Sequence, residues 1–97
     1  MGGSFSGRWA ANAEDVSYTL SLKQKGSGVS GSFKGSDGSV GSLNGKLQGN
    51  VLRFSWVQKD GTRGTGQFVL SDDGQSFDGS YKLSDNSAQG SWSGTRQ

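Results

Sequence analysis

The sequence predicts an all-β fold, an eight-stranded antiparallel up-and-down meander closed into a β-barrel. Apolar residues recur at every second position, which is the period of a β-strand. Seven turn signals divide the chain into eight short segments. The positions between the apolar ones are mostly serine, threonine and lysine. One dry face and one wet face are typical of an antiparallel sheet.

The turn signals set the limits of the expected strands. Five of them contain the glycine that a tight hairpin needs at positive φ, at residues 25–28, 35–38, 48–50, 59–61 and 72–74. Two looser breaks lie at residues 12–15 and 84–87. Short turns make strands that are adjacent in sequence adjacent in space. The strands are therefore expected near residues 5–11, 16–24, 29–34, 39–47, 51–58, 63–71, 76–83 and 88–96.

Alternation assigns the large apolar side chains to one face. Several rings follow a glycine by two positions, as in Gly31-Ser32-Phe33 and Gly79-Ser80-Tyr81. Residues two apart share a face, so we expect each ring to lie beside the glycine of its own strand. An open sheet would expose two edges, which favours a barrel, with a sandwich as the alternative. The predicted core comprises Trp9, Tyr18, Leu20, Leu22, Val29, Phe33, Leu43, Leu47, Leu52, Phe54, Trp56, Phe68, Leu70, Phe77, Tyr81 and Trp92.

Composition limits the chemistry of this chain. Its 97 residues are expected to form one domain, 1–97, in which residues 1–4 are a short leader. The chain has no cysteine and no histidine, so disulfides, thiolates, the commonest metal ligand and the usual neutral-pH base are all absent. No apolar run approaches the roughly 20 residues that span a membrane as a helix. We therefore expect no enzyme, no cofactor, no metal site and no membrane span.

The positions of the charged residues disfavour two other kinds of partner. The aspartates of segment 72–78 resemble a cation site, but their spacing is not that of an EF-hand and Asp-Gly is a strong hairpin signal. Rings interleaved with basic residues are found in single-strand nucleic-acid binders. Here the rings share the dry face and the lysines share the wet face, so stacking and charge are separated. We expect neither calcium nor nucleic acid as a partner.

Both ends of the chain resemble the calycin superfamily, which comprises lipocalins, fatty-acid-binding proteins and avidins. Gly7-Arg8-Trp9 is similar to the Gly-x-Trp of the first strand, and Arg96 is similar to the arginine that ends the last strand. The resemblance implies that Arg96 covers Trp9 where the barrel closes. The length is nearer to avidins, although tight biotin binding is not expected. The resemblance also implies a non-catalytic, exported or secreted ligand-binding protein.

The candidate site lies at one end of the expected barrel. The longer, more polar connections emerge there, and the inward residues nearest to them are Tyr18, Phe33, Trp56 and Tyr81. Trp56 is the only tryptophan expected near this end. An apolar cup with a few polar groups is typical of a small-ligand site, here for a small organic molecule or a sugar. The alternative is a filled core in a structural or protein-interaction module, which self-associates as a homo-oligomer.

Overall fold

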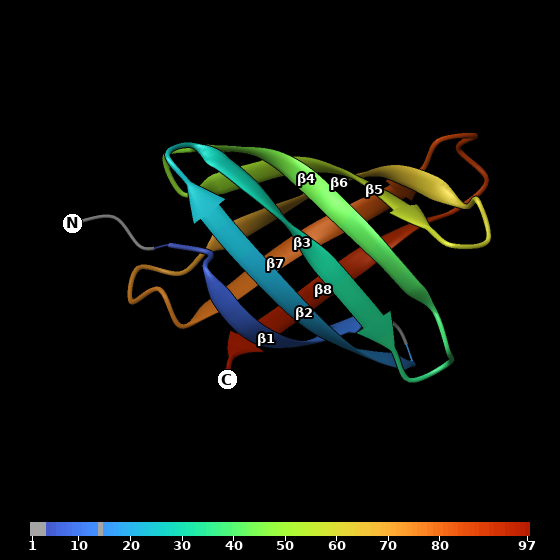
Figure 1. Cartoon of the computed structure of the whole chain (residues 1–97), viewed down its shortest axis with the longest axis horizontal. Coiled ribbons are helices and arrows are strands. Elements are labelled where there is room, and N and C mark those ends of the chain that lie inside the picture. Colours follow the sequence, from blue (N-terminus) through green and yellow to red (C-terminus); the bar gives the residue numbers. More distant parts are fainter. Residues whose placement is uncertain (1–3, 14) are drawn as a thin grey trace.

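The computed structural model describes residues 4–13 and 15–97, which form a closed antiparallel barrel with the strands in sequence order (Figure 1). This confirms the predicted fold class and excludes the sandwich. No helix among the described residues is long and apolar enough to cross a membrane. The strands are β1 Gly7–Ala13, β2 Val16–Lys25, β3 Gly28–Gly35, β4 Val40–Gln48, β5 Val51–Gln58, β6 Arg63–Leu70, β7 Ser76–Leu83 and β8 Gln89–Arg96.

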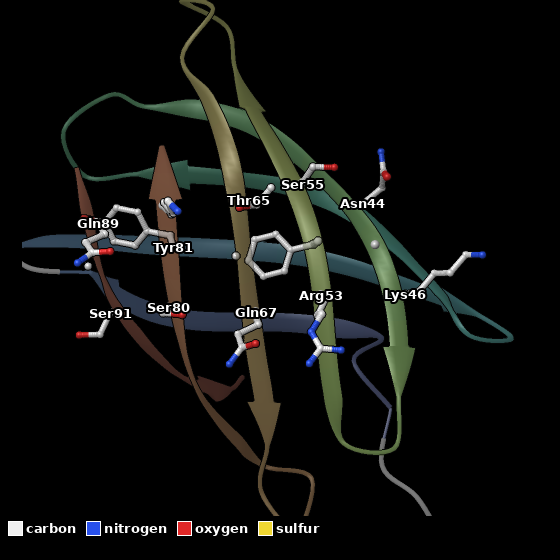
Figure 2. A pocket seen from close by; sticks show the side chains of 15 residues that line it. Asn44, Lys46, Arg53, Ser55, Thr65, Gln67, Ser80, Tyr81, Gln89 and Ser91 are labelled. Carbon is white, nitrogen blue, oxygen red and sulfur yellow. The ribbon is translucent and has the colours of Figure 1, made fainter. Parts of the chain in front are cut away.

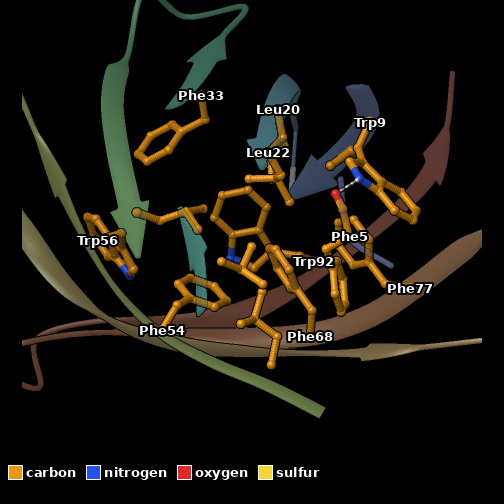
Figure 3. Packing of buried hydrophobic residues seen from close by; sticks show 14 of the residues in the cluster. Phe5, Trp9, Leu20, Leu22, Phe33, Phe54, Trp56, Phe68, Phe77 and Trp92 are labelled. Atoms are coloured by element: carbon orange, nitrogen blue, oxygen red, sulfur yellow. Dashed lines mark hydrogen bonds between the residues drawn. The ribbon is translucent and has the colours of Figure 1, made fainter. Parts of the chain in front are cut away.

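The first strand begins two residues later than predicted, and the cause is Gly7. Its φ of 126° is a conformation that residues with a side chain rarely adopt. The chain turns there, and the Phe5 ring is fully buried within the barrel. The Trp9 indole N–H donates a hydrogen bond to the Phe5 carbonyl oxygen at 2.9 Å (Figure 3). Phe5 therefore closes the end of the barrel that carries the β2–β3, β4–β5 and β6–β7 turns, called the closed end below.

Arg96 holds together the first and last strands. It lies opposite Trp9 in the β1–β8 pairing, and its guanidinium carbon is 4.3 Å from the Trp9 ring centroid. The same guanidinium donates hydrogen bonds to the carbonyl oxygens of Ser4, Ser6 and Gly74. One side chain therefore joins the segment before β1, the β6–β7 connection and the end of β8.

The core follows the predicted alternation. Every residue predicted to face inward is buried except Tyr18, Leu47 and Tyr81, which are half-buried and pack against the core. The intervening positions are mostly exposed. Leu47 is half-buried, whereas Phe5, which the sequence analysis did not assign to the core, is fully buried. The sequence pattern therefore predicts the two faces and misses the contribution of Phe5.

The rings pack on glycines of the neighbouring strand, not on the glycines of their own strand as predicted. A Cβ built on Gly79 would lie 2.8 Å from Cδ1 of Phe68, which is directly opposite in the β6–β7 pairing. The same arrangement recurs around the barrel because adjacent strands bring each ring over a position without a side chain. The other ring–glycine pairs are Tyr18–Gly35, Phe33–Gly41, Trp56–Gly64, Phe54–Gly66, Tyr81–Gly90 and Phe77–Gly94.

Replacing Gly79 by valine is expected to destabilise the barrel by about 1–3 kcal/mol, the usual cost of overpacking. The new Cβ would lie 2.0 Å from the Gln67 carbonyl oxygen, so backbone as well as the Phe68 ring must move. Urea unfolding measures the difference. Gly28→Val is the control, since a Cβ there meets only the Lys25 carbonyl oxygen at 3.5 Å. Equal unfolding midpoints for the two variants would contradict the ring–glycine packing.

Replacing Arg96 by methionine is expected to lower the free energy of unfolding by about 1.5–3 kcal/mol, the range for hydrogen bonds to charged groups. The methionine keeps the apolar stem over Trp9 but leaves three carbonyl oxygens without their donor. Arg8→Met is the control, because Arg8 is exposed on β1. Thermal unfolding of both variants is the measurement. If Arg96→Met lowers the stability no more than Arg8→Met does, Arg96 does not stabilise the closure of the barrel.

Candidate functional site

The two ends of the barrel differ in their connections. The β1–β2, β3–β4, β5–β6 and β7–β8 connections lie together at the end opposite Phe5, on the right of Figure 1. This end is called the mouth below. The order of strands places it there, since every second connection of a meander emerges at the same end.

A cavity of about 240 Å³ opens at the mouth. All four predicted site residues line it, contributed by β2, β3, β5 and β7. The structure thus brings together the side chains that the sequence analysis had grouped. The complete lining is Ala13, Tyr18, Phe33, Asp37, Ser39, Trp56, Gln58, Thr62, Tyr81, Leu83 and Trp92.

Trp92 is the principal residue of the cavity that the sequence analysis missed. It had been assigned to the dry face but to neither end of the barrel, so Trp56 is not the only tryptophan at the mouth. Alternation shows that Trp92 points inward. Its position along the barrel axis depends on the tilt of β8 against the neighbouring strands. In Figure 3 the Trp92 ring lies between Phe33 and Trp56 on one side and the Phe5 plug on the other.

The rings around Trp92 are mostly perpendicular to one another. Tyr81 meets Trp92 at 5.8 Å between ring centroids with an interplanar angle of 89°, and Phe33 meets it at 6.3 Å and 85°. Tyr18 lies 4.9 Å from Trp92 and meets Phe33 edge-on at 73°. Perpendicular rings present both faces and edges, which is a favourable way to pack aromatic groups. Trp92 therefore forms the floor of the cavity, and the other rings form its walls.

The two indole N–H groups of the cavity differ in their partners. Trp56 Nε1 donates to the Thr65 carbonyl oxygen at 3.1 Å, which fixes that ring against β6. Trp92 is only 7% exposed, and its Nε1 is the one buried side-chain nitrogen or oxygen of the described residues that lacks a hydrogen-bond partner. A buried donor without a partner costs about 1–3 kcal/mol. An acceptor brought to Trp92 Nε1 would relieve that cost.

The rim of the cavity carries a carboxylate. Asp37 accepts a hydrogen bond from the Ser39 backbone N–H at 2.9 Å, and hydrogen bonds from the Ser39 side chain and backbone lower the pKa of Asp37 below 3.8. The same turn recurs at the mouth in Asp60 with Thr62 and Asp85 with Ser87. Asp73 accepts from Ser71 and Gln75 in the β6–β7 connection. These aspartates are turn-forming residues, and Asp37 also faces the cavity.

A second depression crosses the outer face of β4–β8 (Figure 2). This outer groove is larger, about 1040 Å³, but it is open to solvent and most of its lining residues are exposed. Its lining comprises polar side chains, the basic residues Lys46, Arg53 and Lys82, and the aromatic residues Phe54 and Tyr81. A ligand there would bury little of its surface, whereas small-molecule sites usually enclose most of the ligand. The mouth cavity is therefore the better candidate site.

The fold and the cavity define the chain as an eight-stranded antiparallel β-barrel with an aromatic cavity at one end. No family model and no curated protein sequence matches it. Among solved structures it is similar to a de novo designed fluorescence-activating β-barrel, with a TM-score of 0.64 and 23% identity. The match covers 96% of this chain and 94% of that chain. At this identity the likeness shows a shared barrel fold and does not extend to membership of the calycin superfamily.

The stability of the fold is expected to fall as the pH drops below about 4, because four turn aspartates become protonated there. Asp37, Asp60, Asp73 and Asp85 each have a folded-state pKa lowered from 3.8 by hydrogen bonds within their turns. A lowered folded-state pKa contributes stability above 3.8 and loses it as the pH falls through the folded value. The measurement is the melting temperature between pH 7 and pH 2. A variant with all four replaced by asparagine should show a shallower acid decline, and an unchanged decline would contradict this origin.

Proposed function

We propose that this chain is a non-catalytic barrel of calycin type that binds a small organic molecule in the mouth cavity. The observation that carries the proposal is the asymmetry of the interior. Phe5 and the rings around it fill the closed end, while five aromatic side chains surround a cavity of about 240 Å³ at the mouth. A core that only stabilises the fold would be expected to bury its aromatic side chains without an opening between them.

The size and polarity of the cavity favour a small ligand whose surface is largely apolar. A dry cavity of about 150 Å³ takes up benzene, so about 240 Å³ is sufficient for a molecule with two fused rings. The unpaired N–H of Trp92 favours a ligand that brings a hydrogen-bond acceptor. These properties fit an aromatic ketone or amide better than a sugar, whose many hydroxyls would meet mostly rings. The cavity lining holds one carboxylate, Asp37, and supports binding more than catalysis.

Two further observations support the proposal. Arg96 lies over Trp9 at the barrel closure, as the calycin resemblance implies. The similar structure is a designed fluorescence-activating β-barrel, which is consistent with a ligand-binding role for a barrel of this fold.

The proposal is tested with 1-indanone, a small bicyclic ketone, titrated into ¹⁵N-labelled protein. We expect shifts at Tyr18, Phe33, Trp56, Tyr81 and Trp92. Ala13→Leu should abolish them, because Ala13 is buried and lines the cavity, so the larger side chain would occupy space that the ligand needs. Ser80→Leu is the matched control, since it adds the same side chain to the outer groove.

Shifts that survive Ala13→Leu and disappear in Ser80→Leu would move the site to the outer groove. An absence of any shift, together with a stable oligomer by native mass spectrometry, would favour the self-associating module instead.

Trp56 is a poor choice for a variant that separates binding from stability. The sequence analysis had placed it near the mouth as a contact residue. Its ring is only 6% exposed, packs over Gly64 and is anchored by the hydrogen bond to Thr65. Trp56→Phe is therefore expected to weaken ligand binding and also to lower the melting temperature.

A further inference from the structure

We propose that the mouth cavity selects an alkylated ammonium ion, such as a quaternary ammonium group, as its ligand. The inference rests on the proposed ligand-binding function and names the chemical class of that ligand. It follows from the rings that surround the cavity and from the charges at its rim.

The lining of the cavity is an arrangement that recognises soft cations. Aromatic faces attract a cation positioned within about 6 Å of the ring centroid, and tryptophan does so best among the aromatic side chains. Here two tryptophans, two tyrosines and one phenylalanine contribute to a single cavity. Trp92 meets Phe33 and Tyr81 at 85° and 89°, so rings of different orientation line the same cavity. Methyl groups on nitrogen spread the charge and fit such apolar walls without hydrogen bonds.

The charges of the lining have one sign. Among the residues that line the cavity, Asp37 is the single charged side chain, and no lysine or arginine is included. The connection at each corner of the mouth carries an aspartate, at positions 15, 37, 60 and 85, while Lys59 and the exposed Arg63 at the start of β6 are the basic residues in or directly beside the β5–β6 connection. Arg96, by contrast, lies at the closed end. A cation that enters the mouth is attracted by these carboxylates. An anion is repelled by them and meets no basic side chain in the cavity lining.

The size of the cavity agrees with this class. A trimethylammonium group with a two-carbon arm is slightly larger than benzene, and about 240 Å³ is larger than the cavity that takes up benzene. The remaining polar lining residues, Ser39, Gln58 and Thr62, lie on the connections and strand ends at the rim, where such an arm emerges.

The decisive comparison is between choline and 3,3-dimethyl-1-butanol, which differ by the exchange of the charged nitrogen for carbon. Binding is followed through the three indole N–H resonances of ¹⁵N-labelled protein. We expect choline to bind at least tenfold more tightly and to shift the signals of Trp56 and Trp92. The signal of Trp9 should stay in place, because its N–H is bonded to the Phe5 carbonyl oxygen at the closed end. Equal affinity for the two probes would overturn the inference.

A pair of matched variants isolates the charge of Asp37. Asp37→Asn and Asp73→Asn each replace an aspartate that accepts a backbone N–H two residues later, at 2.9 and 3.0 Å, so the cost to the turn is similar. Asp37 lines the cavity, whereas Asp73 lies in the β6–β7 connection at the closed end. We expect Asp37→Asn to weaken choline binding at least threefold, with the affinity for 1-indanone unchanged, and Asp73→Asn to leave both affinities unchanged. Equal losses in the two variants would overturn the role of Asp37.

The two proposals fail in different ways. If 1-indanone binds at the mouth and choline binds no better than its neutral isostere, the ligand class is wrong and the ligand-binding function stands. If neither 1-indanone nor choline shifts any cavity resonance, both proposals are overturned.

Discussion

The packing of rings over glycines of the neighbouring strand is the constraint on which this barrel depends. Phe54 lies over Gly66, Phe68 over Gly79, and Tyr81 over Gly90. Each of these glycines is followed two residues later by the next ring, so the rings advance along the strands as they pass around the barrel. That advance is the stagger that closure of a tilted sheet requires. The repeated unit, a glycine followed two residues later by an aromatic residue, thus sets both the packing of the rings and the stagger of the strands.

This packing also explains why the two ends of the barrel differ. At the closed end the rings are supplemented by Phe5, which enters because Gly7 adopts a positive φ, and Arg96 then fixes the segment that carries Phe5. At the mouth no described residue plays that part, and the rings of Tyr18, Phe33 and Tyr81 border open space. The cavity is therefore a consequence of plugging one end only.

Much of this account could be predicted from the sequence because the decisive signals are local. Alternation with a period of two identifies the inward face, and Asp-Gly and Asn-containing turns identify the strand limits to within one or two residues. The same signals group Tyr18, Phe33, Trp56 and Tyr81 at one end. The position of Trp92 at the mouth and the burial of Phe5 were missed, and the glycine partners of the rings were assigned to the wrong strand, since these features depend on the stagger between strands and on a backbone torsion at Gly7. Neither quantity is encoded in a short window of sequence.

The central claim is that the barrel keeps an open aromatic cavity at its mouth while its other end is filled. Xenon binds preferentially in apolar cavities, so a crystal pressurised with xenon tests this claim without any assumption about the ligand. We predict a xenon atom among the rings of Tyr18, Phe33, Trp56, Tyr81 and Trp92, and none around Phe5. A mouth that takes up no xenon because these rings have collapsed onto one another would contradict it.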